Sequence, residues 1–242
     1  RHVIPDRPQL ALLAALCLAL SPQRNAYGLE INNYPLFVFM TTLQLLAFSR
    51  LANRLEQGQT SRTDGLVWGA STAALLWTHV LGAALPAAQL IALFWAPPRR
   101  RALDSVGPGL LATGLLCLPL VPTLLTAGGA PPMNDSVGLN EALRSLLVGF
   151  PGRYGSDTAS TLILVLGAVG CIRAWQSGRV LQRSLVVHLL VLTLIILGMV
   201  STGIAASHQY PYYLGLLPSC CLLLALVFPG QDPSSSRSLD LT

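Results

Sequence analysis

The sequence predicts an all-α fold, namely a polytopic integral membrane bundle of about eight transmembrane helices. Three observations support this prediction. Of the 242 residues, 52% are hydrophobic and only 10% are charged, whereas about 25% are charged in a typical soluble domain. The apolar residues lie in long blocks, as helices that cross a bilayer require. All 15 basic residues are arginines, and they fall between the blocks, where membrane proteins place them to fix orientation.

The apolar blocks define the predicted spans. We place these at about 8–20, 35–50, 66–77, 81–96, 106–126, 159–176, 185–204 and 212–228. Residues 1–228 would thus form one transmembrane helical domain. The polar, Pro- and Ser-rich residues 229–242 are predicted to be a disordered tail. Residues 127–158 are predicted to form a long outer loop, and such loops are usually functional or mobile.

One long stretch, 66–96, contains no Arg, Lys, Asp or Glu. It is longer than one membrane-spanning helix requires and shorter than two such helices usually require. Three arginines precede it within 50–62 and three follow it at 99–101. Two crossings would keep both basic loops on the cytoplasmic side, as the positive-inside rule prefers, and one crossing would separate them. We therefore predict a tight helical hairpin that turns near Thr78–Gly82.

The eight-span topology also separates the arginines by side. Three fall outside, namely Arg24, Arg144 and Arg153. Twelve fall inside, namely Arg1, Arg7, Arg50, Arg54, Arg62, Arg99, Arg100, Arg101, Arg173, Arg179, Arg183 and Arg237. This distribution predicts that both termini are cytoplasmic, and the exclusive use of arginine points to a bacterial plasma (inner) membrane. The outer face would carry the loops 21–34, 78–82, 127–158 and 205–211.

Signatures of soluble enzymes are absent from the sequence, which has no phosphate-binding glycine loop, zinc-protease motif or serine-hydrolase motif. The placement of the arginines between apolar blocks argues against nucleic-acid binding. The cysteines form no CxxC pair and have no His at metal-ligand spacing, so we predict no metal site and interpret them as buried hydrophobes. They are Cys17, Cys117, Cys171, Cys220 and Cys221.

Polar and aromatic residues gather in three clusters at the predicted outer ends of spans. Burial of polar groups in lipid costs free energy, so polar residues at these positions call for a structural or functional explanation. The first cluster, Ser21 to Pro35, contains Arg24, Tyr27, Glu30, Asn32 and Tyr34. The second, at the hairpin tip, contains Thr78 and His79. The third, Ser207 to Pro218, contains His208, Tyr210 and Tyr212.

Each cluster has a structural interpretation beside a functional one. Interfacial tyrosine belts are common in membrane proteins, and a lone histidine is usually a hydrogen-bonded structural residue. We interpret His188, inside the seventh span, as packed against a neighbouring helix. All three clusters nevertheless fall on one predicted face, so they could line a single extracytoplasmic site. Such a site could hold an anionic lipid head group, with charge from Arg24 and donors from hydroxyls and amides.

The stretch LALLAALCLALSPQRNAYGLEINNYPLFVFM, residues 10–40, resembles bacterial membrane glycosyltransferases of the GT-C fold. The similar group is related to protein O-mannosyltransferases and to the aminoarabinose transferases of lipid A. Its Ser-Pro, Tyr and Glu-Ala-Arg-x-Tyr elements align without a gap to Ser21-Pro22, Tyr27, Glu30 and Tyr34. Further elements follow in the family's order over residues 8–228, namely Thr78-His79, Gln89, Arg99–Arg101, Pro119, Pro122, Tyr212, Leu214 and Pro218.

The resemblance implies transfer of a sugar from a polyprenyl-phosphate donor to an acceptor on the extracytoplasmic side, with no cofactor beyond this lipid-linked substrate. The implied donor-binding residues are Arg24, Tyr27, Glu30, Asn32, Tyr34, Thr78, His79, His208, Tyr210 and Tyr212. Two arginines that the family is expected to use for the donor phosphate are Asn32 and Pro211 here. An amide cannot replace the charge of a guanidinium, so Arg24, His79 and His208 would have to compensate.

The family's catalytic Asp lies in its first outer loop, and nothing before Ser21 matches that loop. The resemblance therefore implies that this chain is the C-terminal portion of a longer protein or complex, with the acidic base upstream or on a partner subunit. The missing arginines and the missing loop favour an alternative, namely a non-catalytic membrane subunit of the same fold that binds lipid or braces a complex. A secondary transporter would show inverted repeats and charged mid-span residues, and the sequence has neither.

Overall fold

The structure is a computed structural model that describes residues 8–19, 34–95, 99–123, 157–202 and 216–227. These residues form helices, and no strand occurs among them. In chain order the elements are α1 (Pro8–Ala19), α3 (Tyr34–Glu56), α4 (Arg62–Thr78), the 3-10 helix η1 (Val80–Ala83), α5 (Ala84–Trp95), α6 (Arg99–Cys117), the 3-10 helix η2 (Leu118–Leu120), α9 (Asp157–Gln176), α10 (Val180–Ser201) and α11 (Leu217–Ala225). The predicted all-α class is confirmed for this part of the chain.

Three stretches of helix in the described residues are long and apolar enough to cross a membrane, namely Tyr34–Glu56, Arg101–Thr123 and Val180–Met199. The 23 residues of the first extend about 35 Å, slightly more than the hydrocarbon core of a bilayer. A further apolar helix, Val80–Trp95, is shorter. The fold is thus compatible with a membrane protein, and the count of eight spans stays a prediction. The tail 229–242 and the loop 127–156 lie outside the described residues.

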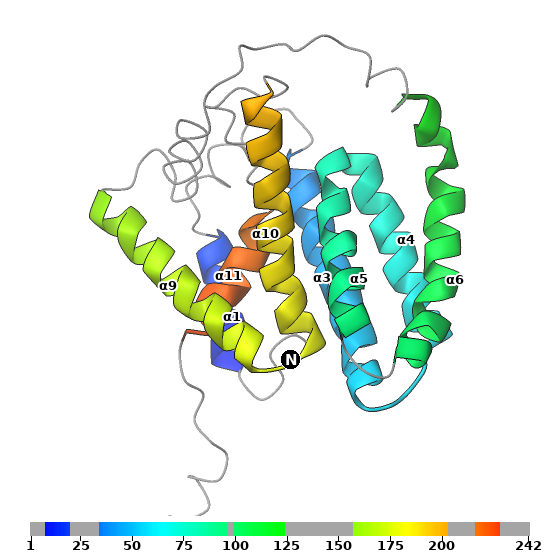
Figure 1. Ribbon diagram of the computed structural model, residues 1–242, viewed down its shortest axis with the longest axis horizontal. Helices are drawn as coiled ribbons and strands as arrows, with labels where there is room; N and C mark the ends of the chain where they lie inside the picture. The colour runs from blue at the N-terminus through cyan, green and yellow to red at the C-terminus, as the bar shows by residue number, and fades with distance from the viewer. Residues whose placement is uncertain (1–7, 20–33, 96–98, 124–156, 203–215, 228–242) are drawn as a thin grey trace, which may run out of the picture.

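Helices α3 and α4 lie side by side and run in opposite directions (Figure 1). At one end, Arg54 of α3 forms an ion pair with Asp64 of α4, with 2.7 Å between Nε and Oδ2. At the other end, Phe37 near the start of α3 stacks on His79, just after the end of α4. The start of α4 is fixed by Ser61, whose hydroxyl accepts a hydrogen bond from the Asp64 backbone N–H at 3.1 Å.

Helices α4 and α5 form the hairpin that the arginine distribution predicts. The indole Nε1 of Trp68 donates to Gln89 Oε1 at 2.7 Å, and a Cβ atom on Gly82 would lie 2.7 Å from Cγ of Leu75. Because the later residue Leu75 of α4 lies near Gly82 and the earlier residue Trp68 reaches the more distant Gln89, the chain doubles back and the two helices are antiparallel. The chain reverses between Thr78 and η1, where sequence alone places the turn.

Helices α4 and α6 run in the same direction and approach each other closely. A Cβ atom on Gly65 would lie 1.8 Å from the Ser105 carbonyl oxygen, and one on Gly69 would lie 2.2 Å from the Gly109 carbonyl oxygen. The hydroxyl of Thr113 donates to the Gly69 carbonyl oxygen at 2.9 Å. This is the small-xxx-small packing that is typical of helix pairs in membranes, where close backbone approach replaces the hydrophobic drive of water.

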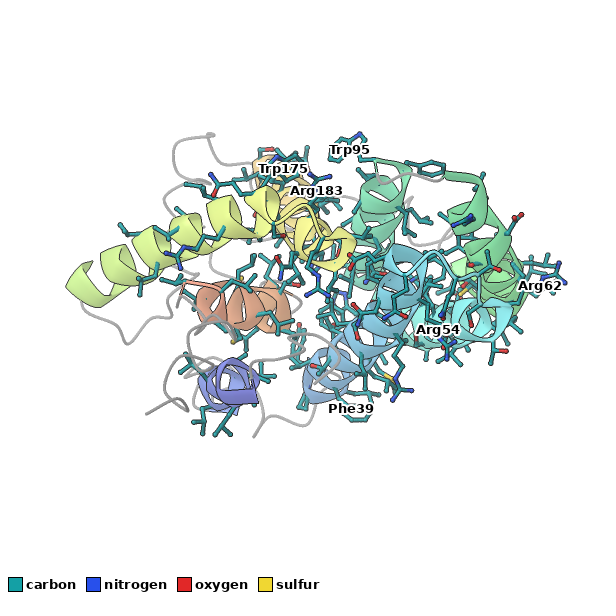
Figure 2. The ribbon with its side chains drawn as sticks, turned by 90° about the horizontal axis from the view of Figure 1, so that it is seen from below. Phe39, Arg54, Arg62, Trp95, Trp175 and Arg183 are labelled. Atoms are coloured by element: carbon teal, nitrogen blue, oxygen red, sulfur yellow. The ribbon has the colours of Figure 1, made fainter. Side chains whose placement is uncertain are left out.

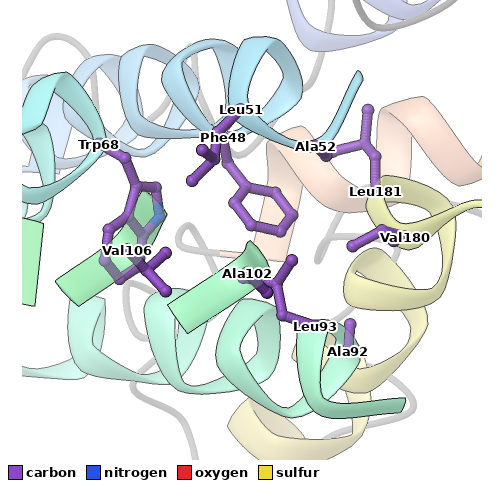
Figure 3. Packing of buried hydrophobic residues seen from close by; sticks show 10 residues of the cluster. All are labelled: Phe48, Leu51, Ala52, Trp68, Ala92, Leu93, Ala102, Val106, Val180 and Leu181. Atoms are coloured by element: carbon purple, nitrogen blue, oxygen red, sulfur yellow. The ribbon is translucent and has the colours of Figure 1, made fainter. Parts of the chain in front are cut away.

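The helices meet around a core that joins α3, α4, α5, α6 and α10 (Figure 3). Its buried residues are Phe48, Leu51, Ala52, Trp68, Ala92, Leu93, Ala102, Val106, Val180 and Leu181. A second cluster packs Leu81 and Ala84 against Leu192 and Ile196 of α10 and Leu216 at the start of α11. Helix α1 contacts the bundle through Ala14, which packs on Cys221 and Ala225 of α11.

The outward side chains of the long helices are largely apolar. Phe39 is 59% exposed, Leu111 67% and Leu194 67%. Several polar side chains are buried instead, among them Gln44, Gln89, Thr72, Ser105, Ser184 and Ser219. Large contiguous apolar surfaces are uncommon on soluble monomers, and inward-facing polar groups are characteristic of membrane helices.

The two ends of the bundle differ in charge. We call one the basic end, made by the last two turns of α3, the first turns of α4, α6 and α10, the end of α9, and the linkers between them. Seven arginine side chains of the described residues belong to it, namely Arg50, Arg54, Arg62, Arg101, Arg173, Arg179 and Arg183. Contacts tie it together: Arg101 donates to the Gly58 carbonyl oxygen at 3.2 Å, and Arg173 donates to the Val227 carbonyl oxygen. The other end carries His79.

Glu56 joins α3 to the start of α10 at the basic end. Its Oε1 accepts a hydrogen bond from the Val180 backbone N–H at 2.8 Å, and its Oε2 lies 3.3 Å from Arg179 Nε. We expect Glu56→Gln to lower the free energy of unfolding by about 1 kcal/mol, because a carboxylate at a helix N-terminus and a partly exposed ion pair are each worth a fraction of that. Thermal unfolding in detergent measures this loss, which should shrink at high salt. Asp104→Asn is the exposed control, and an equal loss there would contradict the assignment.

Candidate functional site

Three of the ten predicted donor-binding residues are described by the structure, and it brings them to one end of the bundle. Tyr34 begins α3, Thr78 ends α4, and His79 follows directly. The ring centroids of Tyr34 and His79 are 6.2 Å apart. The other seven lie outside the described residues, namely Arg24, Tyr27, Glu30, Asn32, His208, Tyr210 and Tyr212. Whether Glu30 and Tyr212 approach His79 therefore stays a prediction.

His79 is held by the turn that it forms. Its backbone is extended, with φ −162° and ψ 130°, so α4 ends there, and its N–H donates to the Leu75 carbonyl oxygen at 3.1 Å. The ring Nδ1 accepts a hydrogen bond from the Leu81 backbone N–H at 3.2 Å. An accepting Nδ1 places the proton of the neutral ring on Nε2. The ring stacks on Phe37 with centroids 4.8 Å apart and 27° between planes.

Thr78 and Trp77 fasten the same end of α4. The Thr78 hydroxyl donates to the Leu75 carbonyl oxygen at 2.6 Å, which also accepts from the His79 backbone N–H. The Trp77 indole N–H donates to the Leu116 carbonyl oxygen of α6 at 3.0 Å. Trp77 is 53% exposed, as an interfacial tryptophan would be. The described contacts of Thr78 thus include a structural one.

The start of α11 reaches this end as well. Leu216, which directly precedes α11, belongs to the same hydrophobic cluster as Leu81 of the turn. Three chain segments therefore meet here: the start of α3, the turn after α4, and the start of α11. We call this the tip end, defined by Tyr34, Phe37, His79, Leu81 and Leu216. The predicted clusters are sequence neighbours of these three segments.

Partial burial lowers the pKa of His79 from its ordinary value of 6.5, because desolvation disfavours the charged ring in the turn between the helices. The unfolded chain then binds more protons than the folded chain as the pH falls below the ordinary value. We expect stability to decrease on acidification through this range, and to decrease less in His79→Gln. Thermal unfolding of both proteins from pH 8 to about pH 5 measures the difference. Parallel curves for the two would contradict the expectation.

Two buried polar groups lie between the ends. His188 of α10 is buried, as predicted, with its Nδ1 2.8 Å from the Ser219 hydroxyl oxygen of α11. Gln89, part of the family resemblance, exchanges hydrogen bonds with Gln44 at 2.6 and 2.8 Å. Gln44 also donates to the Thr72 hydroxyl oxygen at 3.2 Å. These contacts join helices and give both groups a structural role.

No group of three or more His, Cys, Asp or Glu in the described ranges is placed to hold a metal ion. Cys117, Cys171, Cys220 and Cys221 are free thiols. Three carboxylate side chains lie at the basic end: Glu56, Asp64 and Asp104. The described polar groups of the tip end include the imidazole of His79 and the phenol of Tyr34, which are groups that can donate to an oxyanion. The Thr78 hydroxyl already donates to the Leu75 carbonyl oxygen.

Sequence reasoning missed Phe37, which supports the His79 ring, and the tryptophans at the basic end. Phe37 lies three residues after Tyr34, on the same face of a helix, and this spacing was the available signal. Over the described residues, the fold defines the class as all-helical, with three helices long and apolar enough to cross a membrane. Comparison of the chain with protein-family models, with curated proteins and with solved structures found no match.

Proposed function

We propose that this chain is the membrane-embedded part of a glycosyltransferase, which binds a polyprenyl-phosphate sugar at the tip end and passes the sugar to an extracytoplasmic acceptor. The observation that carries the proposal is the meeting of the start of α3, His79 and the start of α11 at the end away from the arginines. The chain segments of the three predicted clusters adjoin these positions. A single donor site requires that the three clusters themselves share this end.

The orientation of the site follows from charge. The positive-inside rule puts the basic end in the cytoplasm of a bacterial inner membrane. The tip end would then face outward, where lipid-linked sugars are used. Exposed apolar side chains such as Phe39 and Leu194 between the two ends support a lipid environment.

The chemistry divides between binding and proton transfer. The donor phosphate carries the negative charge that grows as the glycosidic bond breaks, so groups that donate to it stabilise the leaving group. His79 supports this role through an ordered ring with its proton on Nε2, and Arg24 and His208 are proposed to add positive charge. Deprotonation of the acceptor hydroxyl is assigned to a carboxylate acting as general base. We place this carboxylate outside the described residues.

The experiment uses purified full-length protein in proteoliposomes with polyprenyl-phosphate sugars, and it measures donor binding and sugar transfer separately. We expect His79→Gln to weaken donor binding about tenfold, the loss of one hydrogen bond to a charged group. Arg62→Gln, an exposed change at the basic end, should leave binding unchanged. Equal binding by the parent protein and His79→Gln would contradict the assignment of the site.

A second candidate is a non-catalytic lipid-binding or structural subunit with the same fold. Asn32 and Pro211, in place of the family's two arginines, favour it, as does the location of Glu56, Asp64 and Asp104 at the basic end. Donor binding without transfer for every sugar and acceptor tried would support this candidate. Absence of both binding and transfer would contradict the glycosyltransferase proposal.

A further inference from the structure

Two tryptophans and an arginine form a cluster at one side of the basic end (Figure 2). Trp95 ends α5 and Trp175 lies in the last turn of α9, with ring centroids 5.7 Å apart in an edge-to-face arrangement at 79°. Arg183, in the first turns of α10, places its guanidinium carbon 5.7 Å from the centroid of the Trp175 ring. Three helices thus contribute one side chain each.

The tryptophans remain open to the surroundings, although they contact each other. Trp95 is 54% exposed and Trp175 is 43% exposed. Indole rings of this kind concentrate at the level of lipid head groups, because they combine an apolar body with one polar N–H. Their position beside the arginines puts this cluster at the cytoplasmic boundary of the bilayer.

Arg183 differs from two other arginines of the basic end, Arg179 and Arg54, in its hydrogen-bond and ion-pair partners. Arg179 pairs with Glu56, and Arg54 pairs with Asp64. The Nε atom of Arg183 is buried and has no hydrogen-bond partner in the described ranges. A buried donor without a partner costs about 1–3 kcal/mol, so within the described residues the Arg183 guanidinium is less completely satisfied than those of Arg179 and Arg54.

The turn before α10 places a glycine beside Arg183. Gly178 adopts φ +73°, a conformation that a side chain rarely allows. A Cβ atom there would lie 3.8 Å from Nη2 of Arg183. Hence the guanidinium has backbone without a side chain on that flank, the aromatic face of Trp175 on another, and no ion pair with a carboxylate of the described residues.

We propose that Trp95, Trp175 and Arg183 bind the phosphate of an anionic phospholipid in the cytoplasmic leaflet. The forked guanidinium donors match phosphate oxygens, and the indole rings contact the glycerol and upper acyl region. The seven arginines of the basic end, against the three carboxylates Glu56, Asp64 and Asp104 at that end, raise the local concentration of anionic lipid. This inference rests on the proposed membrane placement and is independent of glycosyl transfer.

The test uses the full chain carrying Trp77→Phe, reconstituted in phosphatidylcholine nanodiscs. This background leaves Trp95 and Trp175 as the exposed reporters, since Trp68 is fully buried. Fluorescence quenching by acyl-brominated phosphatidylglycerol is compared with quenching by brominated phosphatidylcholine at equal mole fraction. We expect the anionic lipid to quench more strongly, with a preference that falls about fivefold in Arg183→Gln.

Arg62→Gln is the matched control, because it removes the same charge at the same end but away from the tryptophans (Figure 2). It should keep the preference. An equal loss of lipid preference in the two variants would show diffuse attraction of anionic lipid to the basic end and would overturn the proposed site. Displacement of the lipid by inorganic phosphate would show a site for a free anion and would also overturn it. If Arg183→Gln does not fold, Arg183→Lys applies. It should keep only part of the preference, and a full preference there would also overturn the proposal.

Discussion

Gly69→Ala is expected to destabilise the bundle by about 2 kcal/mol, although alanine is the better helix former. The new Cβ atom would lie 2.2 Å from the Gly109 carbonyl oxygen and 2.6 Å from the Gly109 Cα. Both atoms belong to the backbone, so no side-chain rotation can make room. The two helices would have to separate, and the Thr113 hydroxyl would lose its 2.9 Å contact with the Gly69 carbonyl oxygen.

Gly114→Ala, in α6, provides the matched control for this prediction. A Cβ atom at Gly114 meets nothing within 4 Å, so the substitution should be neutral or stabilise the helix by up to about 1 kcal/mol. Unfolding of each variant in mixed micelles of detergent and sodium dodecyl sulfate measures both effects. A Gly69→Ala protein as stable as Gly114→Ala would show that α4 and α6 do not pack through these glycines.

The second large effect is expected from Gln89→Leu, which removes the centre of a buried polar network. Gln89 Oε1 accepts from Trp68 Nε1 at 2.7 Å and from Gln44 Nε2 at 2.6 Å. Leucine would leave both donors without that acceptor in a buried site, at a cost of about 1–3 kcal/mol each in soluble proteins. Because membrane hydrogen bonds are often weaker in mutant cycles, we expect a total loss of about 2 kcal/mol.

A double mutant separates the network from simple packing. In Gln44→Leu/Gln89→Leu the unsatisfied amide is removed together with its partner, so the loss should be smaller than the sum of the two single losses. Gln59→Leu, in the exposed linker after α3, is the control for the change of residue type and should be close to neutral. Strict additivity of the two core substitutions would contradict the hydrogen-bonded pair.

The hairpin shows how far sequence could determine the fold. A charge-free stretch between two groups of arginines sufficed to place a reversal near Thr78–Gly82, since orientation depends on charges that are visible in the sequence. Helix ends were harder to predict. Helix α3 continues past the predicted span to Glu56 and α6 begins at Arg99, because apolar composition marks lipid contact and a helix can extend beyond it.

Contacts between helices account for what the sequence could not provide. The Gly65–Gly69 spacing is a visible signal for close packing, but only the fold shows that Ser105 and Gly109 of α6 face it. Gln44 had no distinguishing pattern, since its partner lies in another helix. At the tip end, the residue types and their common end were predictable for Tyr34 and His79. The support from Phe37 depends on the antiparallel register of α3 and α4.

The central claim is that the tip end and the basic end face opposite sides of a membrane, with the tip end outward. Single cysteines at Val80, which is 55% exposed, and at Gln59, in a background without the native cysteines, test it most directly. A membrane-impermeant maleimide is applied to intact bacterial cells that produce the full-length protein. We expect labelling of Val80→Cys in intact cells and of Gln59→Cys only after permeabilisation. Labelling of both from outside, or the reverse pattern, would contradict it.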